Sequence, residues 1–115
     1  MNAAARFRVM KINNLFQNIP AQASAEIFET LWKNSAFTLE RIISTGQTSP
    51  QGEWYDQAWD EWVIVLQGRA GLEFQVAIHE LHAGDYVLIP AHCRHRVAWT
   101  ASSTVWLALH AKPTL

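Results

Sequence analysis

The chain lacks the features that mark several common protein classes. Its 115 residues include a single cysteine, Cys93, so no internal disulfide can form and an oxidising compartment is not required. Lys and Arg number 9 against 10 for Asp and Glu, with no basic run, which argues against nucleic-acid binding. No apolar stretch approaches the roughly 20 residues of a membrane span, and no secretory signal pattern follows the first residues. We therefore expect a cytoplasmic protein that binds neither nucleic acid nor membrane.

Apolar residues make up 50% of the chain, which is enough for one domain of this length to bury its own core. The 6 tryptophans are many for this length. Most of them fall in the second half, at Trp54, Trp59, Trp62, Trp99 and Trp106. Tryptophan combines a bulky ring with one polar N–H, which suits barrel interiors and pocket walls. We expect most of them in the core or an interface, and one or two beside a pocket.

Residues 1–36 are predicted to form an N-terminal extension of a single domain. Within residues 24–33, one face of a short helix would gather four apolar side chains, Ile27, Phe28, Leu31 and Trp32. Ser24 would cap such a helix. Strand alternation fits the same residues almost as well, so the prediction is a short helix with a strand as the alternative.

Residues 37–115 show short alternating runs separated by turn residues. The runs predicted as strands are 37–44, 62–67, 71–77, 86–89, 96–100 and 104–109. Turns are predicted at 49–52, 81–84 and 92–94, with His79 and His82 beside a hairpin loop. Short strands at about ten-residue spacing are typical of an antiparallel sandwich or closed barrel.

Two segments in this region have a distinctive spacing. Glu61 is followed by six strand residues and then Gly68, while Gly84 is followed by five residues, Pro90, and then His95. This spacing resembles the two conserved motifs of the cupin superfamily. The first motif reads Gly, five residues, His-x-His, three or four residues, Glu, six residues, Gly. The second reads Gly, five residues, Pro-x-Gly, two residues, His, three residues, Asn.

The resemblance covers roughly residues 37–110 and implies an all-β fold, the antiparallel jelly-roll barrel or double-stranded β-helix of cupins. The second motif departs from the family pattern at two positions. His92 stands where the family usually has glycine, and Trp99 stands where it has asparagine.

The first motif keeps its carboxylate but lacks both histidines of the His-x-His pair. Counting three residues back from Glu61 places Tyr55 and Gln57 in those positions. Counting four places Trp54 and Asp56 there instead. Neither spacing supplies an imidazole, so the family's usual ligand set is incomplete in this chain.

The resemblance nevertheless implies a site where a cupin binds one divalent transition metal. Glu61 and His95 would be two ligands and Asp56 a third, with Tyr55 or Gln57 as less favoured alternatives to Asp56, and with Fe, Ni, Mn, Zn or Cu as the ion. Alternation along the strand would also turn Val63 and Val65 inward, beneath the carboxylate. The competing interpretation is that Glu61 and His95 simply hydrogen-bond to each other in a barrel without a metal.

The first functional hypothesis is a small single-domain cupin whose barrel-mouth pocket holds one divalent metal and a small polar molecule. Tyr55, Gln57 and Trp99 would line this ligand site. If the chain is an enzyme, Glu61 or His95 would act as acid, base or ligand in isomerase, lyase or oxygenase chemistry. The alternatives are a metal-free small-molecule-binding module and a structural dimer. A homodimer is expected because isolated cupin barrels commonly pair, with tryptophan-rich strands at the interface.

Overall fold

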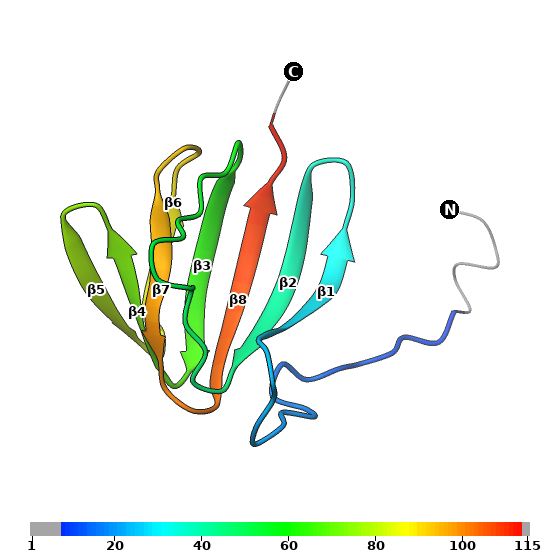
Figure 1. Cartoon of the computed structure of the whole chain (residues 1–115). Helices are drawn as coiled ribbons and strands as arrows, with labels where there is room; N and C mark the ends of the chain where they lie inside the picture. The colour runs from blue at the N-terminus through cyan, green and yellow to red at the C-terminus, as the bar shows by residue number, and fades with distance from the viewer. Residues whose placement is uncertain (1–7, 114–115) are drawn as a thin grey trace.

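The computed structural model describes residues 8–113, which form eight antiparallel strands in two facing sheets (Figure 1). The larger sheet has the order β1 (Ile27–Lys33), β2 (Phe37–Ser44), β8 (Thr104–Ala111), β3 (Asp60–Gln67) and β6 (Tyr86–Ile89). The smaller sheet has the order β5 (Ala77–His82), β4 (Arg69–Phe74) and β7 (His95–Thr100). The predicted all-β jelly-roll barrel is therefore confirmed. The described residues contain no helix long and apolar enough to cross a membrane.

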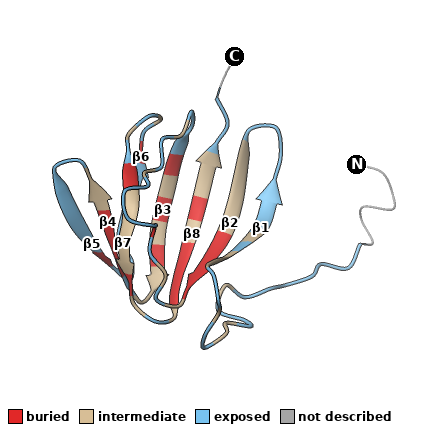
Figure 2. Ribbon diagram, viewed as in Figure 1, coloured by how far each residue is buried: buried red, intermediate tan, exposed pale blue. Residues whose placement is uncertain are grey.

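The core lies between the inner faces of the two sheets (Figure 2). On β3, burial alternates as the sequence predicts, with Glu61, Val63 and Val65 all turned inward. Side chains of β2, β4, β6 and β8 close around them. The buried apolar cluster comprises Ile42, Val63, Val65, Ala70, Leu72, Leu81, Ile89, Trp106 and Ala108.

The short helix predicted within residues 24–33 is wrong, because residues 27–33 form β1, the edge strand of the larger sheet, as the strand alternative has it. Its backbone pairs with β2 from Ile27 opposite Ile43 to Lys33 opposite Thr38. Pairing with β2 supplies the backbone hydrogen bonds that a helix would have made within itself. The helix and strand patterns fit this sequence almost equally, so the tertiary pairing decides between them. The sheet thus begins at Ile27, inside the predicted N-terminal extension.

The strand predicted over 71–77 is also corrected. The chain turns at residues 75–76 and continues as β5, which pairs with β4 along its whole length. His79 and His82 lie on this exposed strand and not beside a loop. Before β4, Gly68 makes a turn with φ +85°, and a Cβ there would come within 2.8 Å of the Thr104 backbone. Both facts require glycine at the end of the first motif.

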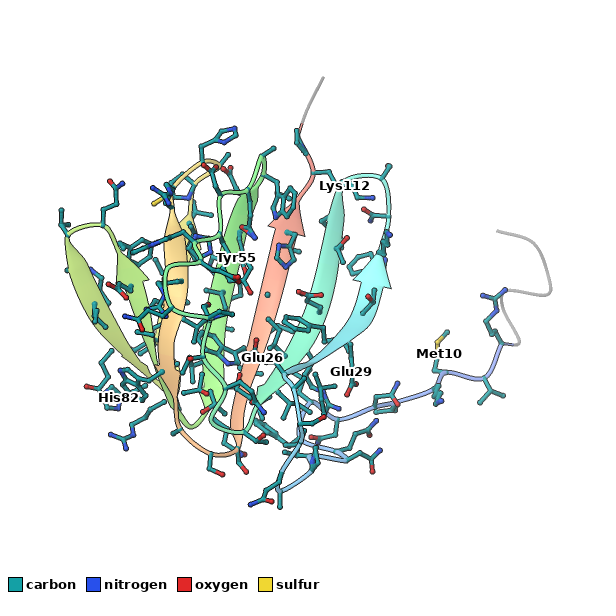
Figure 3. The ribbon with its side chains drawn as sticks, viewed as in Figure 1. Met10, Glu26, Glu29, Tyr55, His82 and Lys112 are labelled. Carbon is teal, nitrogen blue, oxygen red and sulfur yellow. The ribbon has the colours of Figure 1, made fainter. Side chains whose placement is uncertain are left out.

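The N-terminal segment is anchored to the outer face of β2 by a buried arginine. Arg41 donates hydrogen bonds to the carbonyls of Leu15 (2.9 Å) and Gln17 (2.7 Å), and to the Glu29 carboxylate (2.7 Å). Ahead of this anchor, the chain runs away from the barrel as an extended arm that carries Met10 (Figure 3).

Candidate functional site

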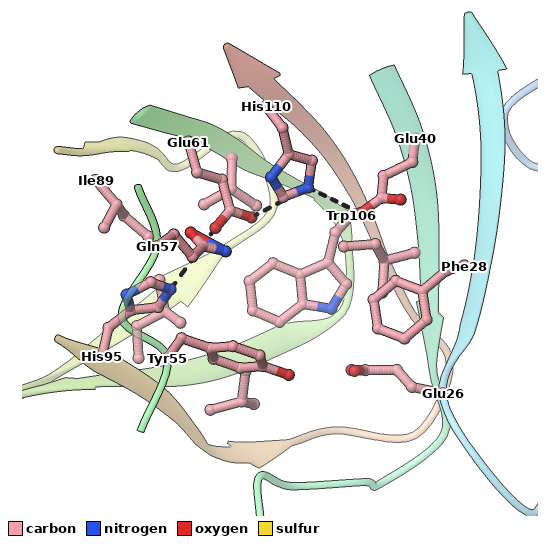
Figure 4. Close-up of a pocket in the computed structure, with 14 residues that line it drawn as sticks. Glu26, Phe28, Glu40, Tyr55, Gln57, Glu61, Ile89, His95, Trp106 and His110 are labelled. Atoms are coloured by element: carbon pink, nitrogen blue, oxygen red, sulfur yellow. Dashed lines mark hydrogen bonds and ion pairs between the residues drawn. The ribbon is translucent and has the colours of Figure 1, made fainter. Parts of the chain in front are cut away.

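A cavity of about 100 Å³ lies between the two sheets and opens to solvent (Figure 4). This is room for a molecule of a few heavy atoms. Apolar core side chains such as Leu72 and Val97 line part of it. Its ionisable groups come from several strands and the loops beside them, and they are Glu26, Glu40, Tyr55, Glu61, His95 and His110.

The Glu61 carboxylate sits between two imidazole rings. Its Oε1 lies 3.6 Å from Nε2 of His95, and its Oε2 lies 3.9 Å from Nε2 of His110. Both separations exceed hydrogen-bond length, and no other described residue donates a closer bond to this side chain. Glu61 is only 9% exposed. The carboxylate is therefore buried, flanked by rings on two sides, and open to a donor from the cavity.

His95 is the charged partner of this carboxylate. Its Nδ1 lies 2.9 Å from the Cys93 carbonyl, which can only accept, so Nδ1 carries a proton. Burial works to lower the pKa of His95, but the Glu61 carboxylate and the Cys93 carbonyl outweigh burial and raise the pKa above its ordinary 6.5. A protonated ring directs its second N–H, at Nε2, toward Glu61.

His110 is held in the opposite state. The Trp59 indole N–H can only donate, and it lies 2.9 Å from Nδ1 of His110, so that nitrogen must be unprotonated. The ring proton then sits on Nε2, from which it is donated to Glu40 Oε1 at 2.9 Å. His110 is a neutral imidazole in this arrangement, with its tautomer fixed by Trp59.

The segment before β3 brings Tyr55 and Gln57 to the cavity. The Tyr55 N–H donates to the His95 carbonyl at 2.7 Å, the His95 N–H donates back at 3.2 Å, and the two rings stack at 5.5 Å. Tyr55 and Gln57 both line the cavity. The structure thus adopts the spacing of three residues between the His-x-His positions and Glu61. The two positions are filled by the phenol of Tyr55 and the amide of Gln57.

Two of the sequence-predicted site residues lie away from this cluster. Asp56 points outward and pairs with the exposed His92 at 3.0 Å, so the structure does not bring it to Glu61 and His95. His92, at the family's glycine position, indeed has a left-handed backbone with φ 63°.

Trp99 does not line the cavity either. The pairing of β4 with β7 shifts register between Val97 and Trp99, which breaks the alternation that would have turned the Trp99 ring inward. The ring instead covers Gly71, where a Cβ would come within 2.3 Å of the indole nitrogen.

At another side of the cavity, Glu26 accepts a hydrogen bond from Ser44, which in turn accepts one from the Trp106 indole at 3.1 Å. Burial raises the pKa of Glu26, and the Ser44 hydroxyl opposes this only in part. The pKa of Tyr55 is also raised, chiefly by burial and then by the negative charges of Glu26 and Glu61. The cavity is thus a negative environment.

The residues present do not fit the metal site that the cupin resemblance implies. Tyr55 and Gln57 stand in the positions of the two histidines, and Asp56 lies outside the cavity. His110 does not replace them, because its Nε2 proton is donated to Glu40 and a protonated nitrogen cannot ligate. Across residues 8–113, no three His, Cys, Asp or Glu side chains are grouped so as to hold a metal ion.

Sequence reasoning missed three ionisable groups of the cavity, Glu26, Glu40 and His110. The register between β3 and β8 places His110 directly opposite Glu61. A weak signal was available, because His110 and Trp106 share one face of an alternating strand that also carries the small Ala108. No motif spacing points to Glu26 or Glu40.

The fold and the site define a small antiparallel barrel with a buried Glu–His pair between its sheets. The Cupin domain family model matches residues 41–110, which is more than half of the chain. The chain belongs to the cupin family. Comparison with curated proteins gives no match.

Solved structures agree with this assignment. A protein from Ralstonia eutropha JMP134 that carries the provisional name mannose-6-phosphate isomerase is 48% identical, covering 90% of this chain and 100% of its own, with a TM-score of 0.87. A cupin superfamily protein from Desulfitobacterium hafniense DCB-2 is 18% identical over 83% of this chain and 84% of its own, with a TM-score of 0.72. A conserved Streptococcus pyogenes protein of unknown function is 17% identical over 94% and 92%, with a TM-score of 0.76. The last two likenesses concern the fold alone.

Proposed function

We propose that the chain is a metal-free cupin that binds a small polar molecule in the cavity between its sheets, with Glu61 and His95 holding its polar end. The observation that supports this most is the Glu61 carboxylate, which is 9% exposed and has both ring nitrogens beyond hydrogen-bond length. A buried carboxylate without a close donor costs free energy, and a hydroxyl or amine of a ligand would supply that donor.

The same pair has the groups needed for acid–base chemistry. The Glu61 carboxylate can accept a proton, and the His95 imidazolium can return one from the adjoining side of the cavity. The Ralstonia protein bears the name of a sugar isomerase. An aldose–ketose isomerisation moves a proton between neighbouring carbons, which is chemistry that such a pair serves. Isomerase-type turnover is therefore the second candidate function.

The test combines ligand screening with metal analysis. We expect compounds that raise the melting temperature of the wild type to lose this effect in Glu61→Gln and to keep it in Glu80→Gln, a matched change of an exposed carboxylate on β5. Elemental analysis of tag-free protein, before and after soaking in Fe, Ni, Mn, Zn and Cu, should find far less than one ion per chain. Near-stoichiometric metal that disappears in His95→Ala would overturn the metal-free proposal.

We also propose that two copies pair, each laying its N-terminal arm on the outer face of the other's larger sheet. The arm carries Val9 and Ile12, which are 89% and 91% exposed and therefore lack a cover within their own chain. The outer face presents a second uncovered apolar surface, where Trp62 packs against Tyr86 beside the exposed Leu88. The arm and the outer face are both apolar and both uncovered within one chain. This favours a dimer in which the arm of each copy covers the outer face of the other.

Light scattering on a sizing column tests this pairing. Wild-type protein should run as a dimer at micromolar concentration, and both Ile12→Asp and Leu88→Lys should run as monomers. Val76→Lys, at the 95% exposed turn between β4 and β5, is the matched control and should remain dimeric. A dimer that survives Ile12→Asp but not Leu88→Lys would show that the outer face pairs without the arm.

A further inference from the structure

The charge of the cavity indicates the chemical class of its ligand. Three carboxylates line it, those of Glu26, Glu40 and Glu61, and no described lysine or arginine does. The one ring that can carry positive charge against them is His95, whose pKa is raised by Glu61 and the Cys93 carbonyl, because His110 is held neutral by the Trp59 indole. The ionised carboxylates therefore outnumber the cationic groups, and the site attracts positive charge.

The walls also offer nothing with which proteins usually hold an anion. Phosphates are bound by Arg or Lys, by the N-terminus of a helix, or by a concave group of free backbone N–H donors. Residues 8–113 contain no helix, and the cavity walls are mostly strands whose amides are engaged in the sheet ladders. A dianionic ligand would meet three carboxylates in this cavity, against which stand only the His95 ring and the neutral donors of Tyr55 and Gln57.

Aromatic rings complete the surface between the carboxylates. The rings of Trp106 and Tyr55 lie between the Glu61 side and the Glu26 side of the cavity, and the Phe28 ring lies beside Glu26 (Figure 4). Faces of such rings attract cations, most strongly where water is excluded. Since His95 already faces Glu61, the ionic partner that a cation needs is Glu26, whose carboxylate is bound, among the described residues, only by the Ser44 hydroxyl.

We propose that the ligand of this cavity is a small organic cation, a protonated or quaternary amine, and not a phosphorylated sugar. This inference rests on the proposed function, since it names the class of molecule that the same cavity binds. A bound cation would also offset the burial that raises the pKa of Glu26, because it would favour the ionised carboxylate.

Calorimetric titration with probes of different charge tests the inference. Ethanolamine and tetramethylammonium are the cations, mannose is the neutral probe, and mannose 6-phosphate is the anion. We expect a cation to bind wild-type protein, mannose to bind at least about tenfold more weakly, and mannose 6-phosphate not to bind. Raising the salt concentration should weaken the cation further, because ionic attraction is screened.

The variant Glu26→Gln separates charge from shape. It keeps an oxygen that can accept the Ser44 hydrogen bond and leaves Glu61 and His95 untouched. Cation affinity should fall about tenfold or more, as expected for losing a charged partner, while mannose affinity stays the same. Glu80→Gln, the exposed control, should leave both affinities unchanged.

The outcomes distinguish the two proposals. Binding of mannose or mannose 6-phosphate with no binding of either cation would overturn the cationic ligand and leave the pocket function standing. An unchanged cation affinity in Glu26→Gln would also overturn it. If no probe of any charge binds and the broader ligand screen finds nothing that depends on Glu61, the pocket function itself fails.

Discussion

His95 and His110 face the same carboxylate across 3.6 and 3.9 Å, yet their other ring nitrogens meet opposite partners. Nδ1 of His95 meets the Cys93 carbonyl and must donate, whereas Nδ1 of His110 meets the Trp59 indole N–H and must accept. The first ring is therefore prepared to carry a charge and the second is held neutral. Glu61 thus has an imidazolium on one side and a neutral imidazole on the other.

The difference shows that the protonation of a histidine beside a carboxylate is not set by that carboxylate alone. The group on the far nitrogen decides which tautomer is available, and that group comes from a different part of the chain in each case. In His95 it is a backbone carbonyl two residues away, and in His110 it is a tryptophan ahead of β3.

The largest effect should appear when each ring is removed in turn. His95→Ala leaves the Glu61 carboxylate buried without its cation and should lower the free energy of unfolding by about 3 kcal/mol. His110→Ala removes a neutral ring and its two hydrogen bonds, with Glu40 and with Trp59, and should cost only about 1–2 kcal/mol. Urea unfolding at pH 6 measures both. Equal losses in the two variants would show that the rings do not differ in charge.

Glu61→Gln should affect the two rings unequally. Without the carboxylate, burial dominates at His95, so its pKa should fall from above the ordinary value of 6.5 to below it. The tautomer of His110 should stay the same, because Trp59 and not Glu61 fixes it. NMR titration of the carbon-bound imidazole protons reports the pKa of His95, and two-bond nitrogen–proton spectra report the tautomer of His110. A His95 pKa that stays raised in the variant would contradict the pairing with Glu61, and Glu40→Gln serves as the control that leaves it raised.

The two rings also differ in how far the sequence could reveal them. Glu61 and His95 lie within local motifs whose spacing is readable along the chain. His110 faces Glu61 only because β8 pairs with β3 in one particular register, and residues far apart in the sequence give no local sign of it. The same limit explains Trp99, where a register shift on β7 undoes simple alternation. It also explains β1, where pairing with β2 overrides a helical pattern. Alternation and turn residues otherwise predicted most strands, because those signals are local.

The pH dependence of stability should carry the signature of His95. Since its pKa is raised on folding, its stabilising contribution is complete below about pH 6.5 and is lost as pH rises through the folded-state pKa. The free energy of unfolding should therefore decrease over that range in the wild type and much less in His95→Gln. Urea unfolding at half-unit pH steps measures this slope. The pKa of Glu26 is also raised, so the titration of Glu26 lowers the free energy of unfolding as well, beginning near pH 4.5. The measurement is therefore repeated in Glu26→Gln, which removes this contribution.

Trp59→Phe should produce the smallest effect and the most specific one. The substitution keeps an aromatic ring beside His110 but removes the N–H that donates to Nδ1 at 2.9 Å. Because Trp59 is 36% exposed, water can replace this donor and the free energy of unfolding should change by less than about 1 kcal/mol. The tautomer of His110 is then no longer fixed, so two-bond nitrogen–proton NMR spectra should change from a pure Nε2–H form to a mixture. His95, whose Nδ1 is bound to a backbone carbonyl, should show no change. An unaltered His110 tautomer in this variant would mean that the hydrogen bond to Glu40, and not Trp59, fixes the Nε2–H form.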